Sequence, residues 1–171
     1  TIVNYGAGNL RSVVNAVSQL GYRPKVTSSP EDVLNAQAVI LPGVGAAADT
    51  MVNLKELGLD ENTIVFYTSD NGPNTPFLKD LDSAGGFRGI KRRLYEGGIR
   101  AAMAVRWPGR VPAGRTSDFV WDMRDVFPTA CEIAGVDAPA GLDGMSVLPT
   151  LLGKRQEGHE HLYWEFYSPF Q

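Results

Sequence analysis

The sequence predicts an α/β protein with a mostly parallel sheet sandwiched between helices in three layers. Three observations lead to this class: short β-branched runs alternate with amphipathic stretches through residues 1–58, glycines end those stretches, and another apolar run follows at residues 63–69. Strands that alternate with helices are typical of parallel sheets, because a crossover helix is what returns the chain to the same end of the sheet. We therefore expect one continuous α/β domain.

The first elements follow from hydrophobic spacing and turn residues. TIVNY at the start reads as a strand, and residues 9–20 carry apolar side chains at helical spacing up to a stop at Gly21. RPKVTS predicts a second strand, and Pro30 opens a short helix, EDVLNA. AVIL (residues 38–41) predicts a third, fully buried strand.

Another amphipathic helix is expected over residues 49–58, stopped by a glycine. TIVFYTS then predicts a fourth strand in the same parallel sheet. Residues 72–100 are rich in Gly, Pro, Asn and Arg, which is typical of a functional loop or a disordered one. AAMAVRW predicts a strand, residues 126–134 a helix with Pro128 in its first turn, and HLYWEFY (residues 161–167) a final strand.

Composition excludes several classes of function. The chain has 171 residues, a net charge of −3 and no apolar run of the ~20 residues that a membrane span needs, so we expect neither nucleic acid nor membrane as a partner. We expect no signal peptide, because the sequence opens directly on a strand. The single Cys131 excludes a disulfide framework and a multi-cysteine zinc site, and its apolar helical position favours the core. Localisation and oligomeric state stay open.

Two sets of motifs suggest two ancestries. NYGAGNLRSVVNAVSQLGY and AVILPGVGA, within residues 1 to about 58, resemble the glutamine amidotransferase subunit of imidazole glycerol phosphate synthase. The resemblance implies that Gly43, Val44 and Gly45 are a remnant of the oxyanion strand, whose backbone N–H groups would stabilise a tetrahedral intermediate. The nucleophilic cysteine of that family and its activating His and Glu are absent from the sequence. Residues 1–51 are assigned to this segment.

The second set begins near residue 52 and resembles the C-terminal half of the catalytic domain of type I sulfatases. Its motifs are ELGLDENTIVFYTSDNGP, FRGIKRRLYEGGIR, RWPGRVPAG, FPTACEIAGV and PAGLDGMSVLPTLLG. By this resemblance Asp70 and Asn71 hold part of an active-site calcium, and Lys91 contacts the sulfate ester. Without the resemblance, Asp70 and Asn71 would be interpreted as part of a capped Asx-Gly turn, and Lys91 as part of an exposed basic loop. Residues 52–171 are assigned to this segment, and the chain is interpreted as a chimera.

The expected site is incomplete. The sulfatase pattern also needs two aspartates on the first strand, where only Asn4 stands, and a C-x-P-S-R motif that the sequence does not contain. Calcium takes about six to eight oxygen ligands, so we expect it to bind weakly or not at all. A small sulfate ester or another anion remains a possible ligand. His159 and His161 imitate a metal pair, but a surface edge is the preferred interpretation.

Three functions therefore stay open. The first is a calcium-dependent sulfuric ester hydrolase, and the second is a non-catalytic α/β chimera, designed or recombined. The third and weakest is a glutamine-hydrolysing subunit of histidine biosynthesis. Both enzymes need an activated cysteine or its oxidised product, and Cys131 is the one cysteine in the sequence. We expect a sulfatase-like chain without activity.

Overall fold

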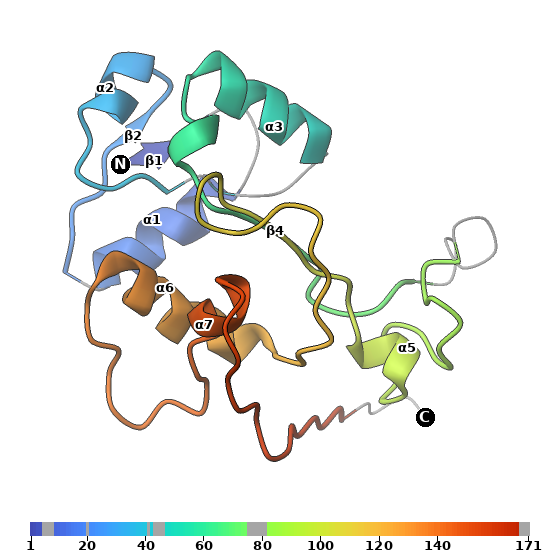
Figure 1. Cartoon of the computed structure of the whole chain (residues 1–171). Helices are drawn as coiled ribbons and strands as arrows, with labels where there is room; N and C mark the ends of the chain where they lie inside the picture. Colours follow the sequence, from blue (N-terminus) through green and yellow to red (C-terminus); the bar gives the residue numbers. More distant parts are fainter. Residues whose placement is uncertain (5–8, 20, 41, 43–46, 75–81, 168–171) are drawn as a thin grey trace. The chain divides into compact units, whose positions relative to one another are not determined.

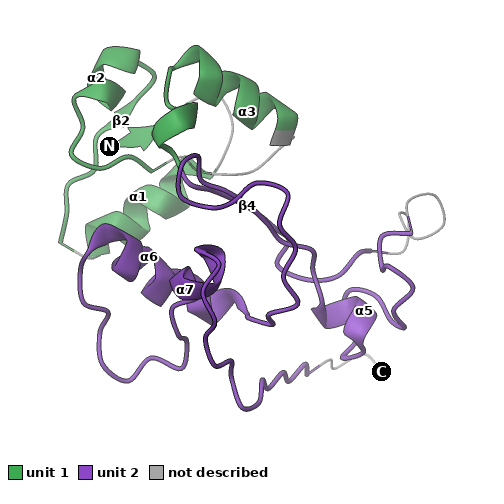
Figure 2. Cartoon of the chain, viewed as in Figure 1, with its two compact units in different colours: residues 1–63 green, residues 64–171 purple. Residues whose placement is uncertain are grey.

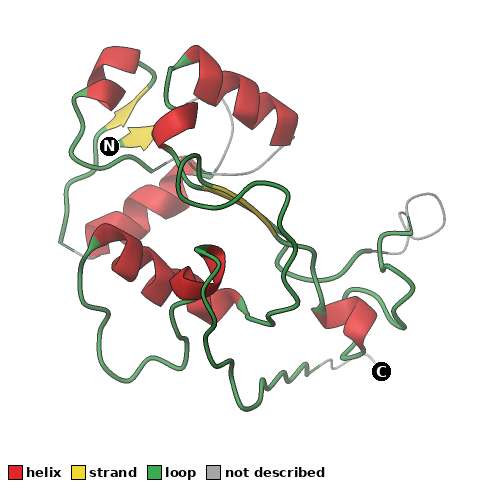
Figure 3. Ribbon diagram, in the orientation of Figure 1, coloured by secondary structure: helices red, strands yellow, loops and turns green. Residues whose placement is uncertain are grey.

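The computed structural model describes residues 1–4, 9–19, 21–40, 42, 47–74 and 82–167. The chain divides into two compact units, residues 1–63 (unit 1) and 64–171 (unit 2), coloured separately in Figure 2. Helices and small sheets are both present, which confirms the α/β class (Figure 3). Within the described ranges, no helix is long and apolar enough to cross a membrane.

Unit 1 is built on a short parallel sheet (Figure 1). Its elements in chain order are β1 (Ile2–Val3), α1 (Leu10–Gln19), β2 (Val26–Thr27), α2 (Pro30–Leu34), α3 (Ala47–Glu56) and the 3-10 turn η1 (Asp60–Asn62). Ile2 lies opposite Val26 and Val3 opposite Thr27 in the β1–β2 pair. Ile2 and Val3 are almost completely buried, so the strand at the start of the chain supplies part of the apolar core.

The helices of unit 1 begin and end within two residues of the predicted positions. The Asn9 side-chain oxygen accepts the Ser12 N–H at 3.2 Å and so caps the start of α1. Gly21 and Gly58 follow α1 and α3 with φ of 84° and 65°, a left-handed conformation that glycine adopts without a steric penalty. Both predicted amphipathic helices are therefore confirmed, and Leu54 of α3 is among the buried apolar side chains.

The prediction of a single parallel sheet is wrong for the described residues. Val39 and Ile40 are 40% and 39% exposed, and Ile40 forms only one parallel bridge, with Ile2, so the predicted third strand is neither fully buried nor extended into a ladder. The run at residues 63–69 does form a strand, but in a separate antiparallel sheet. An apolar run predicts an extended segment and does not identify its pairing partner, which is set by contacts distant in sequence.

Unit 2 combines that antiparallel pair with short helices. Its elements are β3 (Val65–Tyr67), α5 (Glu96–Ile99), β4 (Ala104–Arg106), the 3-10 turn η3 (Met123–Asp125), α6 (Val126–Ala134) and α7 (Leu148–Leu151). Phe66 of β3 lies opposite Val105 of β4, and its ring meets that of Trp121 edge to face at 6.4 Å. Pro128 lies in the first turn of α6, and Cys131 is buried in the same helix, both as predicted.

The final predicted strand is absent, because residues 161–167 have no regular secondary structure in the part of the chain that the structure describes. The alternating pattern is present, yet Tyr163 and Tyr167 are 71% and 86% exposed. A strand satisfies its backbone N–H and C=O groups by pairing with a neighbour. No described strand of unit 2 pairs with this segment, so its pattern alone does not make it a strand.

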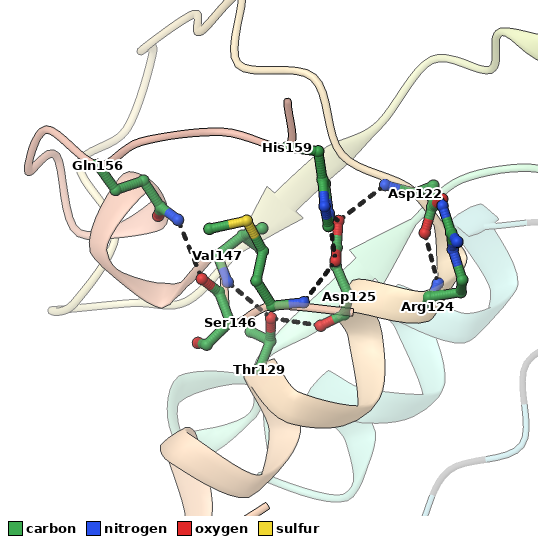
Figure 4. A network of polar contacts seen from close by, with 9 residues as sticks. Asp122, Arg124, Asp125, Thr129, Ser146, Val147, Gln156 and His159 are labelled. Atoms are coloured by element: carbon green, nitrogen blue, oxygen red, sulfur yellow. Dashed lines mark hydrogen bonds and ion pairs between the residues drawn. The ribbon is translucent and has the colours of Figure 1, made fainter. Parts of the chain in front are cut away.

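The packing of α6 against the loop before α7 depends on a buried threonine. Thr129 is completely buried, and its hydroxyl donates to the Asp125 carbonyl oxygen at 2.6 Å and accepts the Val147 N–H at 2.9 Å (Figure 4). Val147 is itself 1% exposed. One hydroxyl therefore satisfies two backbone groups that water does not reach.

Replacing Thr129 by valine keeps the shape of the side chain and removes the hydroxyl. The Val147 N–H then stays buried without an acceptor, and we expect the free energy of unfolding to fall by about 1–3 kcal/mol. Thr129→Ser, the matched control, keeps the hydroxyl and loses a methyl group, so it should cost about 1 kcal/mol. Chemical denaturation of the three proteins measures both changes. A larger loss in the serine variant than in the valine variant would contradict the assigned hydrogen bonds.

Candidate functional site

The acid–amide pair predicted as a metal-site remnant lies directly after β3. Asp70 is exposed, and its carboxylate receives a long hydrogen bond from the Ser69 hydroxyl, at 3.5 Å. Asn71 is half-buried, and Gly72 behind it is buried. The end of β3 therefore presents one carboxylate toward solvent and fixes the backbone just beyond it.

Backbone hydrogen bonds join this turn to the loop that carries Lys91. The Gly72 N–H donates to the Gly98 carbonyl at 2.9 Å, and the Lys91 N–H donates to the Pro73 carbonyl at 2.9 Å. The structure thus brings the Asp70–Asn71 turn and the Lys91 loop together on one backbone frame. The Lys91 side chain is exposed.

Three glycines make this close approach possible. A Cβ atom on Gly72 would collide with the carbonyl oxygen of Gly97, one on Gly97 with that of Gly89, and one on Gly98 with that of Arg93. The sequence interpretation of residues 72–100 as a loop without a regular period missed this role. The available signal was the Gly97–Gly98 pair, because glycine marks positions where two backbones approach closely.

Two arginines of the loop make their contacts within the loop itself. Arg88 lies over the Tyr95 ring at 3.9 Å, and Arg100 lies over Phe87 at 4.8 Å while its side chain pairs with Glu96 at 2.7 Å. These contacts are exposed, so each contributes little stability. Their effect is to orient two of the arginines along the loop.

The surroundings of Asp70 do not form a metal centre among the described residues. No group of three His, Cys, Asp or Glu side chains gathers there or elsewhere in the described ranges. Asp70 and Asn71 offer one carboxylate and one amide, which does not fit an ion that needs about six to eight oxygens. The predicted oxyanion remnant, Gly43 to Gly45, lies outside the described residues.

An open groove of about 1930 Å³ crosses unit 2, and Asp70 lies on its border. Trp107, Trp121 and Trp164 also border it, together with Arg115 and His159. Lys91 is not among the described residues that border this groove. The two predicted site residues therefore share a backbone frame and do not face a common hollow.

His159 is not at a surface edge, contrary to the sequence interpretation. Its side chain is 13% exposed, and Nε2 lies 2.8 Å and 3.0 Å from the two carboxylate oxygens of Asp125, a completely buried residue. His161, two residues further on, is exposed. The two histidines therefore differ in their surroundings and do not form a metal pair. Sequence reasoning missed Asp125, which no motif had singled out.

A second carboxylate in the same region caps the turn before α6. Asp122 accepts the Arg124 N–H at 2.8 Å and its Nε at 2.8 Å, while the Asp125 side chain accepts the Asp122 N–H at 3.0 Å. Burial raises the pKa of Asp122, but the hydrogen bonds from Arg124 outweigh it and hold the pKa below its ordinary value. This reciprocal pair is a capping box that fixes the start of η3, the turn that leads into α6.

With this geometry established, comparison with known proteins identifies the class of the second part. Residues 86–170 match the family described as N-sulphoglucosamine sulphohydrolase, C-terminal. A protein solved with its substrate, D-glucosamine-2-N,6-O-disulfate, is similar over 72% of this chain and 24% of its own, at 27% identity and a TM-score of 0.58. Unit 2 is thus sulfatase-like.

Individual relatives separate the two ancestries. Imidazole glycerol phosphate synthase subunit HisH of Dehalococcoides mccartyi is 65% identical over 60 residues, which is 35% of this chain and 29% of that protein. N-acetylgalactosamine-6-sulfatase of Canis lupus familiaris is 40% identical over 106 residues, 58% of this chain and 20% of that protein. The chain is a chimera of a HisH-like N-terminal segment and a sulfatase-like remainder, and it spans less than a third of either relative.

Gly72→Ala tests the close packing behind the acid–amide pair. The new Cβ would meet the Gly97 carbonyl oxygen, so the Gly72–Gly98 hydrogen bond must break, and we expect unfolding free energy to fall by about 2–3 kcal/mol. Gly158→Ala is the control, because its Cβ would lie in ordinary contact, 3.5 Å from the Phe119 ring. That variant should be unchanged or slightly more stable. Equal stability of the two variants in urea unfolding would contradict the packing argument.

Proposed function

We propose that residues 52–171 preserve the C-terminal scaffold of a sulfuric ester hydrolase without a working catalytic centre. The family match over residues 86–170 and the backbone frame that joins Asp70 to the Lys91 loop support the scaffold. The observation that carries the loss of catalysis is the position of Cys131. It is the one cysteine of the sequence, and it is 8% exposed in the middle of α6.

A buried cysteine inside a helix is poorly suited to nucleophilic catalysis. A reactive cysteine needs access to substrate and a neighbouring group that favours the thiolate. Cys131 is followed by Glu132-Ile133-Ala134 and not by the Pro-Ser-Arg of the sulfatase pattern. The same residue would have to serve glutamine hydrolysis, and the argument against it is the same.

The role proposed for Lys91 is that of a weak anion contact inherited from a sulfate-binding lysine. Its ammonium group is exposed on a loop with four arginines, Arg88, Arg92, Arg93 and Arg100. Arg88 and Arg100 are engaged with the aromatic rings of the loop. A single solvated ammonium group gives an anion little binding energy, so a small sulfate ester would be held only loosely.

The proposal predicts that the purified chain does not hydrolyse an aryl sulfate or glutamine above the uncatalysed rate. The reason is that neither nucleophile motif is present and the available thiol is buried. Release of a chromogenic phenol from its sulfate ester, and of ammonia from glutamine, measures the two activities.

Cys131→Ala separates a true activity from a contaminant. Any turnover that persists in this variant comes from another source, because the substitution removes the only candidate nucleophile. Turnover that the wild-type chain shows and Cys131→Ala lacks would overturn the proposal, provided that far-ultraviolet circular dichroism shows the variant to be folded.

Calcium binding at Asp70 and Asn71 is predicted to be absent at physiological concentration. The pair supplies one carboxylate and one amide. A single negative charge gives too little Coulomb energy to replace the hydration shell of a doubly charged ion. Isothermal titration with calcium should show only heat of dilution. A saturable heat that disappears in Asp70→Ala and persists in Asp60→Ala would mean that other groups complete the site.

A further inference from the structure

Residues 161–167, HLYWEFY, have the side-chain pattern of a β-strand. Apolar residues alternate along this segment with residues that carry a polar group. The apolar row is Leu162, Trp164 and Phe166, and the polar row is His161, Tyr163, Glu165 and Tyr167. The segment runs extended (Figure 1), and in the part of the chain that the structure describes its backbone forms no hydrogen bond with another segment. Unpaired N–H and C=O groups of this kind are available to another chain.

The exposure of the side chains follows the same alternation. Tyr163 and Tyr167 of the polar row are 71% and 86% exposed, whereas Trp164 and Phe166 of the apolar row are 40% and 46% exposed. Leu162 of the apolar row is half-buried. A pleated backbone turns successive side chains to opposite faces and so produces this difference. The segment thus already has the pleat of a strand, and its apolar row is the less exposed one.

The chain is fixed to unit 2 just before this segment. The Gln156 side chain bonds to backbone groups of two earlier residues, at 2.9 Å and 3.0 Å, and the His159 ring lies 2.8 Å from the Asp125 carboxylate. Further along the described chain, the Tyr163 hydroxyl donates to the Glu165 carboxylate at 3.1 Å, a hydrogen bond that lies inside the segment. The segment is therefore anchored at its start, and its own backbone is left open for pairing.

A second copy of the same segment is complementary to it in one antiparallel register. With Trp164 opposite Trp164 of the second copy, residues 162 and 166 lie opposite each other, which unites the two apolar rows on one face. Glu165 then lies opposite Tyr163, a donor, and the two Glu165 carboxylates stay diagonal to each other. A parallel pair in register would set Glu165 directly against Glu165, which their like charges oppose. A shift by one residue would set the apolar row against the polar row.

We propose that residues 161–167 are an interaction surface for a second copy of this chain, which they bind as an antiparallel strand pair centred on Trp164. Of the antiparallel registers, this one pairs all seven residues of the segment. The pair has a two-fold axis, so the contact is closed and stops at a dimer. Two paired strands alone are only marginally stable, so association is weak. The inference goes beyond the function proposed above and does not depend on it.

Two substitutions of the exposed Tyr163 test this register, because they change the charge across from Glu165. Tyr163→Lys gives each Glu165 an opposite charge across the pair, and Tyr163→Glu gives it a like charge. Sedimentation velocity over about 1 μM to 1 mM measures the dissociation constant of the dimer. We expect the wild type to approach the dimer within this range. The dissociation constant of the glutamate variant should be on the order of tenfold higher than that of the lysine variant, because two cross-strand pairs change sign.

Tyr22 provides the matched control, because it is an exposed tyrosine outside the segment, at 69% exposure. Tyr22→Lys and Tyr22→Glu change the net charge by the same amounts and should dimerise like the wild type. A wild-type chain that stays monomeric throughout this range, or one that grows past the dimer, would overturn the proposal. So would equal affinities of the two Tyr163 variants, or an equally large difference between the two Tyr22 variants.

Cross-linking tests the register independently of charge. Tyr163→Cys and Glu165→Cys are prepared as separate proteins and oxidised with glutathione disulfide, each alone and as a mixture. In the proposed pair, position 163 of one copy lies about 4.5–5.5 Å from position 165 of the other between Cα atoms, within reach of a disulfide. In either variant alone the new thiols are diagonal neighbours, about 7–8 Å apart between Cα atoms and too far to bridge.

The mixture should therefore form a cross-linked dimer, and neither variant alone should do so at a comparable rate. The wild-type chain under the same conditions gives the background from Cys131, which is buried. A variant that cross-links alone as fast as the mixture does would contradict the antiparallel register and overturn the proposal. A mixture that forms no more cross-linked dimer than the wild type would overturn it as well.

Discussion

The interaction on which unit 2 most depends is the solvation of the buried Asp125 carboxylate by the protein itself. An ionised group without water is costly unless hydrogen bonds replace the water. Here the polar partners come from three separate parts of the sequence: the turn before α6, the loop at Met145 and the segment at His159. The requirement of one side chain therefore brings together segments up to 34 residues apart. Thr129 joins the first two of these parts a second time, through its own hydroxyl.

A different constraint positions the acid–amide turn, where the backbone packs against itself. Gly72, Gly97 and Gly98 each lie where a Cβ atom would overlap a carbonyl oxygen of a neighbouring segment. The close approach lets short backbone hydrogen bonds replace a side-chain core, which this loop lacks. The same frame shows that holding site residues in place and supplying enough metal ligands are two different requirements. The frame holds Asp70 and Lys91 on connected segments, whereas the ligands that would complete a calcium site are not supplied by the described residues.

Local features were predictable from the sequence, and long-range ones were not. The helices of unit 1, their glycine stops and the burial of Cys131 follow from side-chain spacing and turn chemistry, which act over a few residues. The prediction of strand pairing failed, because the strand that contains Phe66 pairs antiparallel with a segment 39 positions away, at Val105. The acid–amide turn and Lys91 were singled out as candidate site residues through motif resemblance. The backbone hydrogen bonds that join them could be seen only in the structure. His159 was misplaced because its partner, Asp125, carries no motif.

The boundary that the motifs predict between the two ancestries lies inside a helix, a place where a joint between two families is readily tolerated. The expected family boundary at residue 51 lies within α3, while the compact units divide later, between Thr63 and Ile64. Leu54 lies past the predicted family boundary and belongs to unit 1, where it is 1% exposed. An amphipathic helix requires only apolar side chains at the correct spacing, so either parent sequence can supply them. A catalytic site cannot be exchanged in this way, because each ligand and nucleophile must be a particular residue at a particular place. A chimera joined at a helix can therefore keep its packing and lose its chemistry.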